Sequence, residues 1–135
     1  MSSQFSFTKI IVADVDRLFA FYRDVFGMAE TARVRQGEGE AKLDEIIMGP
    51  AGVVYSVPSL VIQRYPNRPI PPCGEATLGF IVPDIDRTIE TALAAGATID
   101  RPLRTATEHG IRVAFIKDPD GHRIEIVQML QNHES

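Results

Sequence analysis

The sequence predicts an α+β fold built from two tandem βαβββ modules, whose strands form a curled mixed β-sheet groove flanked by helices. The prediction begins with a repeat: the segment Ile11–Arg17 (IVADVDR) returns 70 residues later as Ile81–Arg87 (IVPDIDR). A repeat of this period indicates one supersecondary unit used twice. Each copy also follows an apolar strand-like stretch and precedes an amphipathic helical pattern. Two copies would pair to bury their helices and enclose the groove.

The first module is predicted over about residues 5–65. It opens with a strand over 5–12, followed by Asp14, a residue type that caps helix N-termini. The helix after this cap ends at Gly27, which fits the left-handed C′ position. Strands are predicted at 29–35, 42–48 and 59–65. The apolar residues of the helix follow the spacing of one buried face: Leu18, Phe21, Tyr22, Val25 and Phe26.

A linker over 66–75 separates the modules, because the proline density there excludes a helix or a central strand. The second module, about 76–129, begins with a strand over 76–82 and a helix capped by Asp84 and ended by Gly96. A short strand is predicted at 98–101 and longer ones at 111–117 and 123–129. The buried face of this helix is predicted to carry Ile85, Ile89, Ala92 and Leu93.

Composition places the chain among ordinary globular proteins. Its 135 residues are predicted to form a single domain, 1–135, with 44% hydrophobic and 24% charged residues. The net charge of −4 argues against nucleic-acid binding, which needs a basic face. With one cysteine no internal disulfide is expected, and no apolar run reaches the roughly 18 residues of a membrane span. The first residues lack the basic start and apolar core of a signal peptide, so a cytoplasmic location is expected.

Two motifs give the chain a family resemblance. They are the strand–VxDxDR–helix repeat and the ending Ala114–Val127 (AFIKDPDGHRIEIV). Through them the chain resembles the vicinal oxygen chelate (VOC) superfamily over about residues 5–129. This superfamily includes glyoxalase I, bleomycin-resistance proteins and extradiol dioxygenases. The resemblance implies a small-molecule partner and a homodimer.

The resemblance also implies where a divalent metal would be bound. Family members use a histidine in the first strand of each half and a carboxylate in the last strand of one or both. The histidine positions here are Phe7 and Thr77, and the carboxylate position of the first half is Val61. Only Glu125 offers a ligand. Catalytic zinc and non-haem iron sites use about three protein ligands, so no metal cofactor is expected.

Period-two alternation, with the face that the family turns inward, gives the lining of the groove. The mixture of apolar and polar side chains is typical of a small-molecule pocket. Because an isolated buried charge is costly, the sequence also gives the hypothesis that Lys9 and Glu125 pair where the family holds its metal. The predicted ligand-binding residues are Phe7, Lys9, Val61, Gln63, Thr77, Phe115 and Glu125.

Three functions stay open, in this order. The first is metal-independent binding of an apolar or aromatic small molecule, as bleomycin-resistance relatives sequester drugs. The second is a metal-independent isomerase or lyase with Glu125 as general acid or base. The third is a metal-dependent glyoxalase- or dioxygenase-like enzyme with atypical ligands such as Glu125 and His109. Whether the chain is an enzyme is left undecided, and lyase or isomerase chemistry is favoured over dioxygenase chemistry.

Overall fold

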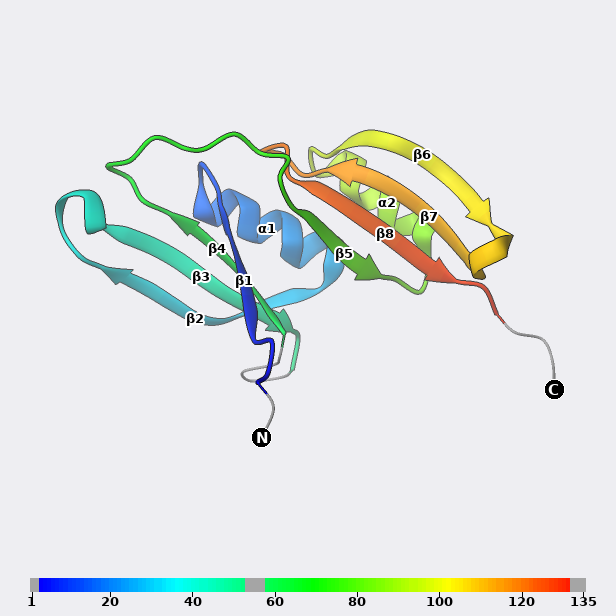
Figure 1. The fold of residues 1–135 in the computed structure, drawn as a ribbon, viewed down its shortest axis with the longest axis horizontal. Helices are drawn as coiled ribbons and strands as arrows, with labels where there is room; N and C mark the ends of the chain where they lie inside the picture. Colours follow the sequence, from blue (N-terminus) through cyan, green and yellow to red (C-terminus); the bar gives the residue numbers. More distant parts are fainter. Residues whose placement is uncertain (1–2, 53–57, 132–135) are drawn as a thin grey trace. The chain divides into compact units, whose positions relative to one another are not determined.

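The fold contains the βαβββ unit twice. The computed structural model describes residues 3–52 and 58–131, and the chain divides into two compact units, residues 1–72 and 73–135. Each unit is described by itself below. The predicted α+β class and the repeated element order are confirmed (Figure 1).

The first unit is a four-stranded sheet with one covering helix. Its elements are β1 (Phe7–Ile11), α1 (Val15–Phe26), β2 (Met28–Gln36), the 3-10 turn η1 (Gly39–Ala41), β3 (Leu43–Pro50) and β4 (Ser59–Arg64). The sheet order is β1-β4-β3-β2, with β1 parallel to β4 and the other pairs antiparallel. Helix α1 packs on one face, where the core is fully buried. Its members include Leu18, Tyr22, Ile46, Met48 and Ile62.

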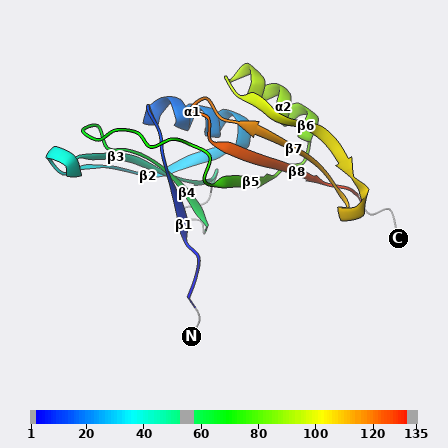
Figure 2. The same cartoon turned by 45° about the horizontal axis from the view of Figure 1, so that its top comes forward.

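The second unit repeats this arrangement. Its elements are β5 (Thr77–Ile81), α2 (Ile85–Ala94), β6 (Thr98–Ala106), the 3-10 turn η2 (Thr107–His109), β7 (Ile111–Lys117) and β8 (Arg123–Met129). The sheet order is β5-β8-β7-β6, again with its first pair parallel. Figure 2 shows α2 lying along one face of this sheet. The core on that side includes Ile85, Ala92, Ile116, Ile124 and Ile126.

The repeated aspartates have the same structural roles in both units. Asp14 and Asp84 are the N-caps of α1 and α2, and each carboxylate accepts a backbone N–H at 3.1 Å from the residue three positions later. The second aspartate of each motif binds an arginine on a strand of its own unit. Asp16 accepts from Arg33 of β2 at 2.6 Å, and Asp86 accepts from Arg112 of β7 at 2.8 Å. The repeat therefore encodes a cap and an ion pair in each unit.

Several predicted boundaries are wrong. Strand β6 has nine residues rather than four and passes through Pro102. This is possible because β6 lies at the edge of its sheet and its register shifts between Arg101 and Arg104, the stretch that contains this proline. Strand β3 ends at Pro50 rather than at residue 48, and β1 starts at Phe7 rather than Phe5. Leu93, predicted on the buried face of α2, is 44% exposed.

Candidate functional site

The strand register shows that the predicted site residues occupy corresponding positions in the two units. In the first unit Lys9 pairs with Val61, and in the second Gly79 pairs with Glu125. Val61 is therefore the counterpart of Glu125, as the sequence predicts. One pair earlier, Phe7 lies beside Ser59 and Thr77 lies beside Arg123. The neighbours Ile62 and Ile126 belong to the core under the helices, so alternation places the site residues on the opposite faces.

The first unit carries a partly buried ion pair on the face of its sheet opposite α1. In each unit, the sheet face opposite the helix is called the open face. Lys9 Nζ lies 3.2 Å from Glu45 Oε1, and the Glu45 side chain is only 8% exposed whereas that of Lys9 is 38% exposed. The same ammonium group lies 5.6 Å from the centre of the Phe7 ring, which is itself exposed. The pair neutralises a carboxylate that would otherwise be a costly buried charge.

Gln63 lies directly beside this ion pair. It is the cross-strand partner of Glu45 in the β3–β4 ladder, so both side chains leave the sheet on the same face. Gln63 is 8% exposed, and its Oε1 atom is enclosed without a hydrogen-bond partner among the described residues. Buried polar atoms are almost always paired, so an unpaired one marks a place for a missing partner.

The second unit carries an arginine–aromatic cluster. The Arg123 guanidinium lies 4.0 Å from the centre of the Phe115 ring, and that of Arg101 lies 5.8 Å from the same ring. Arg123 also donates to Asp100 at 2.9 Å and to the Thr77 hydroxyl at 3.4 Å. The Arg123 guanidinium holds the pKa of the Asp100 carboxyl below its usual range, first through the hydrogen bond and then through its charge. Asp100 is therefore ionised at neutral pH.

Glu125 lies between Gly79 and Phe115 in the sheet. It is partly buried, and it makes no hydrogen bond or ion pair with the described residues of its own unit, 73–131. A Cβ atom placed on Gly79 would meet nothing within 4 Å, so one flank of this carboxylate is open. The carboxylate is thus available to a ligand.

A divalent metal, which the family resemblance implies, does not fit the donor set of these positions. Phe7 and Val61 have no donor atom, and the Thr77 hydroxyl already accepts from Arg123. Within the described part of the chain, no three His, Cys, Asp or Glu side chains gather closely enough to hold a metal.

The structure brings the predicted residues together within each unit. Phe7, Lys9, Val61 and Gln63 share the open face of the first sheet, and Thr77, Phe115 and Glu125 share that of the second. Sequence reasoning missed Glu45, the partner that the structure gives to Lys9. The alternation in β3 could have placed Glu45 on the open face, since Ile46 and Met48 face the helix, but it could not have paired Glu45 with Lys9. The pairing of Lys9 with Glu125 stays a prediction.

Other candidates have structural roles or lie apart from these faces. His109 is exposed in η2. His122 Nδ1 lies 2.9 Å from Asp118, which also accepts three backbone N–H bonds in the turn before β8. Partial burial raises the pKa of the Cys73 thiol, and the carboxylates of Asp118 and Asp120 raise it further. Cys73 is therefore a protonated thiol at neutral pH, as expected of a bystander.

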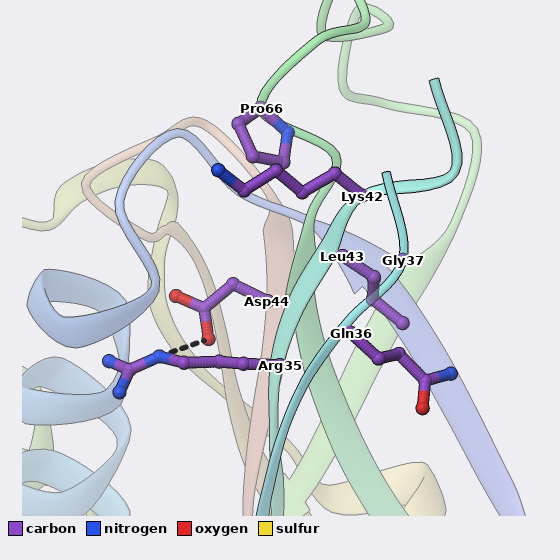
Figure 3. Close-up of a pocket in the computed structure, with 7 residues that line it drawn as sticks. All are labelled: Arg35, Gln36, Gly37, Lys42, Leu43, Asp44 and Pro66. Carbon is purple, nitrogen blue, oxygen red and sulfur yellow. Dashed lines mark ion pairs between the residues drawn. The ribbon is translucent and has the colours of Figure 1, made fainter. Parts of the chain in front are cut away.

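A shallow cavity of about 460 Å³ lies at the end of the β2–β3 hairpin (Figure 3). Arg35 and Asp44 point to one side of the hairpin and form an ion pair at 3.4 Å, whereas Gln36 points to the other side. No predicted site residue lines it. The lining residues are Arg35, Gln36, Gly37, Lys42, Leu43, Asp44 and Pro66.

Comparison with known proteins gives consistent relatives. The family model described as the Glyoxalase/Bleomycin resistance protein/Dioxygenase superfamily matches residues 4–126. A probable lactoylglutathione lyase from Vibrio cholerae is 30% identical, with 93% of this chain and 91% of that protein aligned. One from Vibrio parahaemolyticus is 33% identical, over 92% of this chain and 89% of that protein.

A solved structure shares the fold. A glyoxalase family protein from Bacillus cereus superposes with a TM-score of 0.81 over 97% of both chains, at 17% sequence identity. In the part of this chain that the structure describes, neither helix has the length and apolar content to cross a membrane. The family match spans nearly the whole sequence and agrees with the repeated βαβββ architecture. The chain belongs to the Glyoxalase/Bleomycin resistance protein/Dioxygenase superfamily.

Proposed function

We propose that this chain binds an apolar or aromatic small molecule on the open faces of its sheets and does so without a metal ion. The observation that carries the proposal is the replacement of ligand donors by Phe7, Val61 and Thr77, with Lys9 and Arg123 beside two of these positions. An ion pair in each unit, Lys9–Glu45 and Arg123–Asp100, stands beside the positions where the family resemblance would place metal ligands. The polar part of the ligand is then bound by side chains of the protein instead of by a metal ion.

The make-up of the faces supports an organic ligand. The exposed Phe7 ring and the half-buried Phe115 ring offer flat apolar surfaces, each with a cationic group over it. Small-molecule sites combine apolar lining with a few polar groups that fix orientation. Two further expectations belong to this proposal: a homodimer, which the family resemblance implies, and the cytoplasmic location that the sequence predicts.

A second candidate function is proton transfer by Glu125. Its carboxylate has no partner among the described residues of its own unit and has open space on the side of Gly79. A carboxylate in a partly apolar site suits general acid–base catalysis of an isomerisation or lyase step. The names of the relatives favour this chemistry class, since several are lactoylglutathione lyases. A metal-dependent lyase with Glu125 as one ligand is the third candidate.

Metal content tests the proposal first. The protein is purified without chelators or a histidine tag, its metals are measured by elemental mass spectrometry, and Zn, Ni, Mn and Fe are then added back in a thermal-shift assay. We expect near-zero metal and no rise in Tm, because Phe7, Val61 and Thr77 occupy three of the four positions at which the family resemblance implies a metal ligand. About one metal per chain would contradict the proposal and favour the metal-dependent lyase.

An activity assay distinguishes a binding protein from an enzyme that uses Glu125. Metal-free protein is assayed with lactoylglutathione over a range of pH, together with the Glu125→Gln variant. A simple binding protein shows no turnover in either form. Turnover that depends on pH and is lost in Glu125→Gln, while ligand affinity is kept, would instead establish Glu125 as the general acid or base.

A further inference from the structure

We propose that Glu45 and Gln63 form a hydrogen-bonding subsite in the first unit that recognises a hydroxyl group on the apolar ligand. The inference rests on the proposed small-molecule binding and adds the chemistry of the ligand's polar group. Neither residue matches a position at which the family resemblance implies a metal ligand. Both stand on the face of the sheet opposite α1, side by side in the β3–β4 ladder.

The first step is the count of hydrogen bonds. Glu45 uses one carboxylate oxygen, Oε1, for Lys9, and no described residue bonds its second oxygen. Gln63 Oε1 is enclosed and unpaired, and its amide nitrogen makes no bond to a described residue either. Two neighbouring side chains thus keep unused hydrogen-bonding capacity in a place where water has little access.

The second step is the surroundings of this pair. Along the same row of the sheet, Val34 lies beside Glu45 and Ile11 lies beside Gln63. The next row contains Val61, which is 2% exposed. A polar pair between apolar side chains makes strong hydrogen bonds, because the local dielectric is low. The ligand part that reaches it must be apolar except for the group that makes the bonds.

The third step is the charge of that group. Lys9 already neutralises Glu45, so a cationic ligand group would leave one positive charge in excess. An anionic group would face the carboxylate. A neutral hydroxyl fits best, since it donates to a carboxylate or amide oxygen and can accept from the amide N–H₂. Leaving such atoms unpaired in the free protein lowers its stability, a cost often seen at functional sites.

The experiment compares phenol with anisole, which has the same ring but no hydroxyl donor. Binding is measured by titration of ¹⁵N-labelled protein, following the backbone amides of β3 and β4. We expect phenol to bind about tenfold more tightly than anisole, because one hydrogen bond between the hydroxyl and the Gln63 amide contributes about 1.4 kcal/mol. In Gln63→Met this preference is expected to shrink toward equal binding. The matched control is Gln36→Met, on an exposed strand end, which should keep it.

The melting temperature of Gln63→Met tests the inference without any ligand. Gln63→Met keeps the side-chain length but removes the enclosed polar atoms, so its Tm should rise above that of the wild-type protein. A lower Tm would show that water or protein partners satisfy the amide, and would overturn the inference. Equal binding of phenol and anisole by wild-type protein would overturn the hydroxyl subsite and leave the proposed function standing. If neither compound binds up to its solubility, the hydroxyl subsite and the proposed aromatic binding are both wrong.

Discussion

Asp16 and Asp86 show how single residues of the repeat contribute to stability. Each is the second aspartate of its motif, and each binds an arginine from a strand of its own unit. The hydrogen bond from Arg33 lowers the pKa of the Asp16 carboxyl, and that from Arg112 lowers the pKa of Asp86. A carboxyl group whose pKa falls on folding stabilises the native state only while it is ionised.

The pH dependence of stability follows from this shift. Because the pKa of Asp16 is lower in the folded protein, its contribution is fully present above the ordinary value of 3.8 and is lost as pH falls through the folded-state pKa. We expect Asp16→Asn to lower the free energy of unfolding at pH 7 by less than about 1 kcal/mol, since the pair is exposed. Urea denaturation between pH 7 and pH 2 should show this difference shrinking below about pH 4.

The control for this prediction is Glu90→Gln, an exposed residue of α2 that pairs with no described residue. It removes one negative charge but no ion pair. A difference between wild type and Asp16→Asn that stays constant down to pH 2 would show that Arg33 does not stabilise the ionised carboxylate.

The residue scale also shows why the candidate site could be predicted only in part. Phe7, Val61, Thr77 and Glu125 were named because the family resemblance implies ligand positions on these strands, and their role in a site stays a prediction. The partner of Lys9 could not be found in this way, because Lys9 and Glu45 are 36 positions apart and lie on strands that are not neighbours in the sheet. Ion pairs between such strands depend on three-dimensional side-chain geometry, which periodicity does not contain.

At the scale of elements, local signals predicted helices better than edge strands. Helix α1 begins after its predicted cap Asp14, and Gly27 takes the left-handed conformation, with φ of 70°, that ends it. Strands β7 and β8 have the predicted bounds, since their apolar alternation is bordered by a clear turn. Strand β6 was predicted too short because Pro102 usually ends a strand, and only its position at the sheet edge allows the strand to continue.

At the scale of the whole molecule, the repeat that predicted the fold is also seen in matching core residues of the two units. Ile62 of β4 and Ile126 of β8 are both fully buried beneath the helix of their own unit. Register relates them to each other, since Ile62 pairs with Ile10 in the first unit and Ile126 with Phe80 in the second. Hydrophobic patterning could place these residues inside without any knowledge of the ligand, whereas the function depends on a few polar side chains on the other face.

Truncation of a buried isoleucine should destabilise the protein to a similar extent in either unit. We expect Ile62→Ala and Ile126→Ala each to lower the free energy of unfolding by about 2–4 kcal/mol, because each deletes a side chain from a close-packed interior. The control Ile81→Ala removes a side chain that is 74% exposed, so it should change stability by less than about 0.5 kcal/mol. Urea denaturation of the three variants measures these losses. A loss below about 1 kcal/mol for either core variant would show that its unit does not depend on the core assigned to it, because a surface-like response is incompatible with full burial.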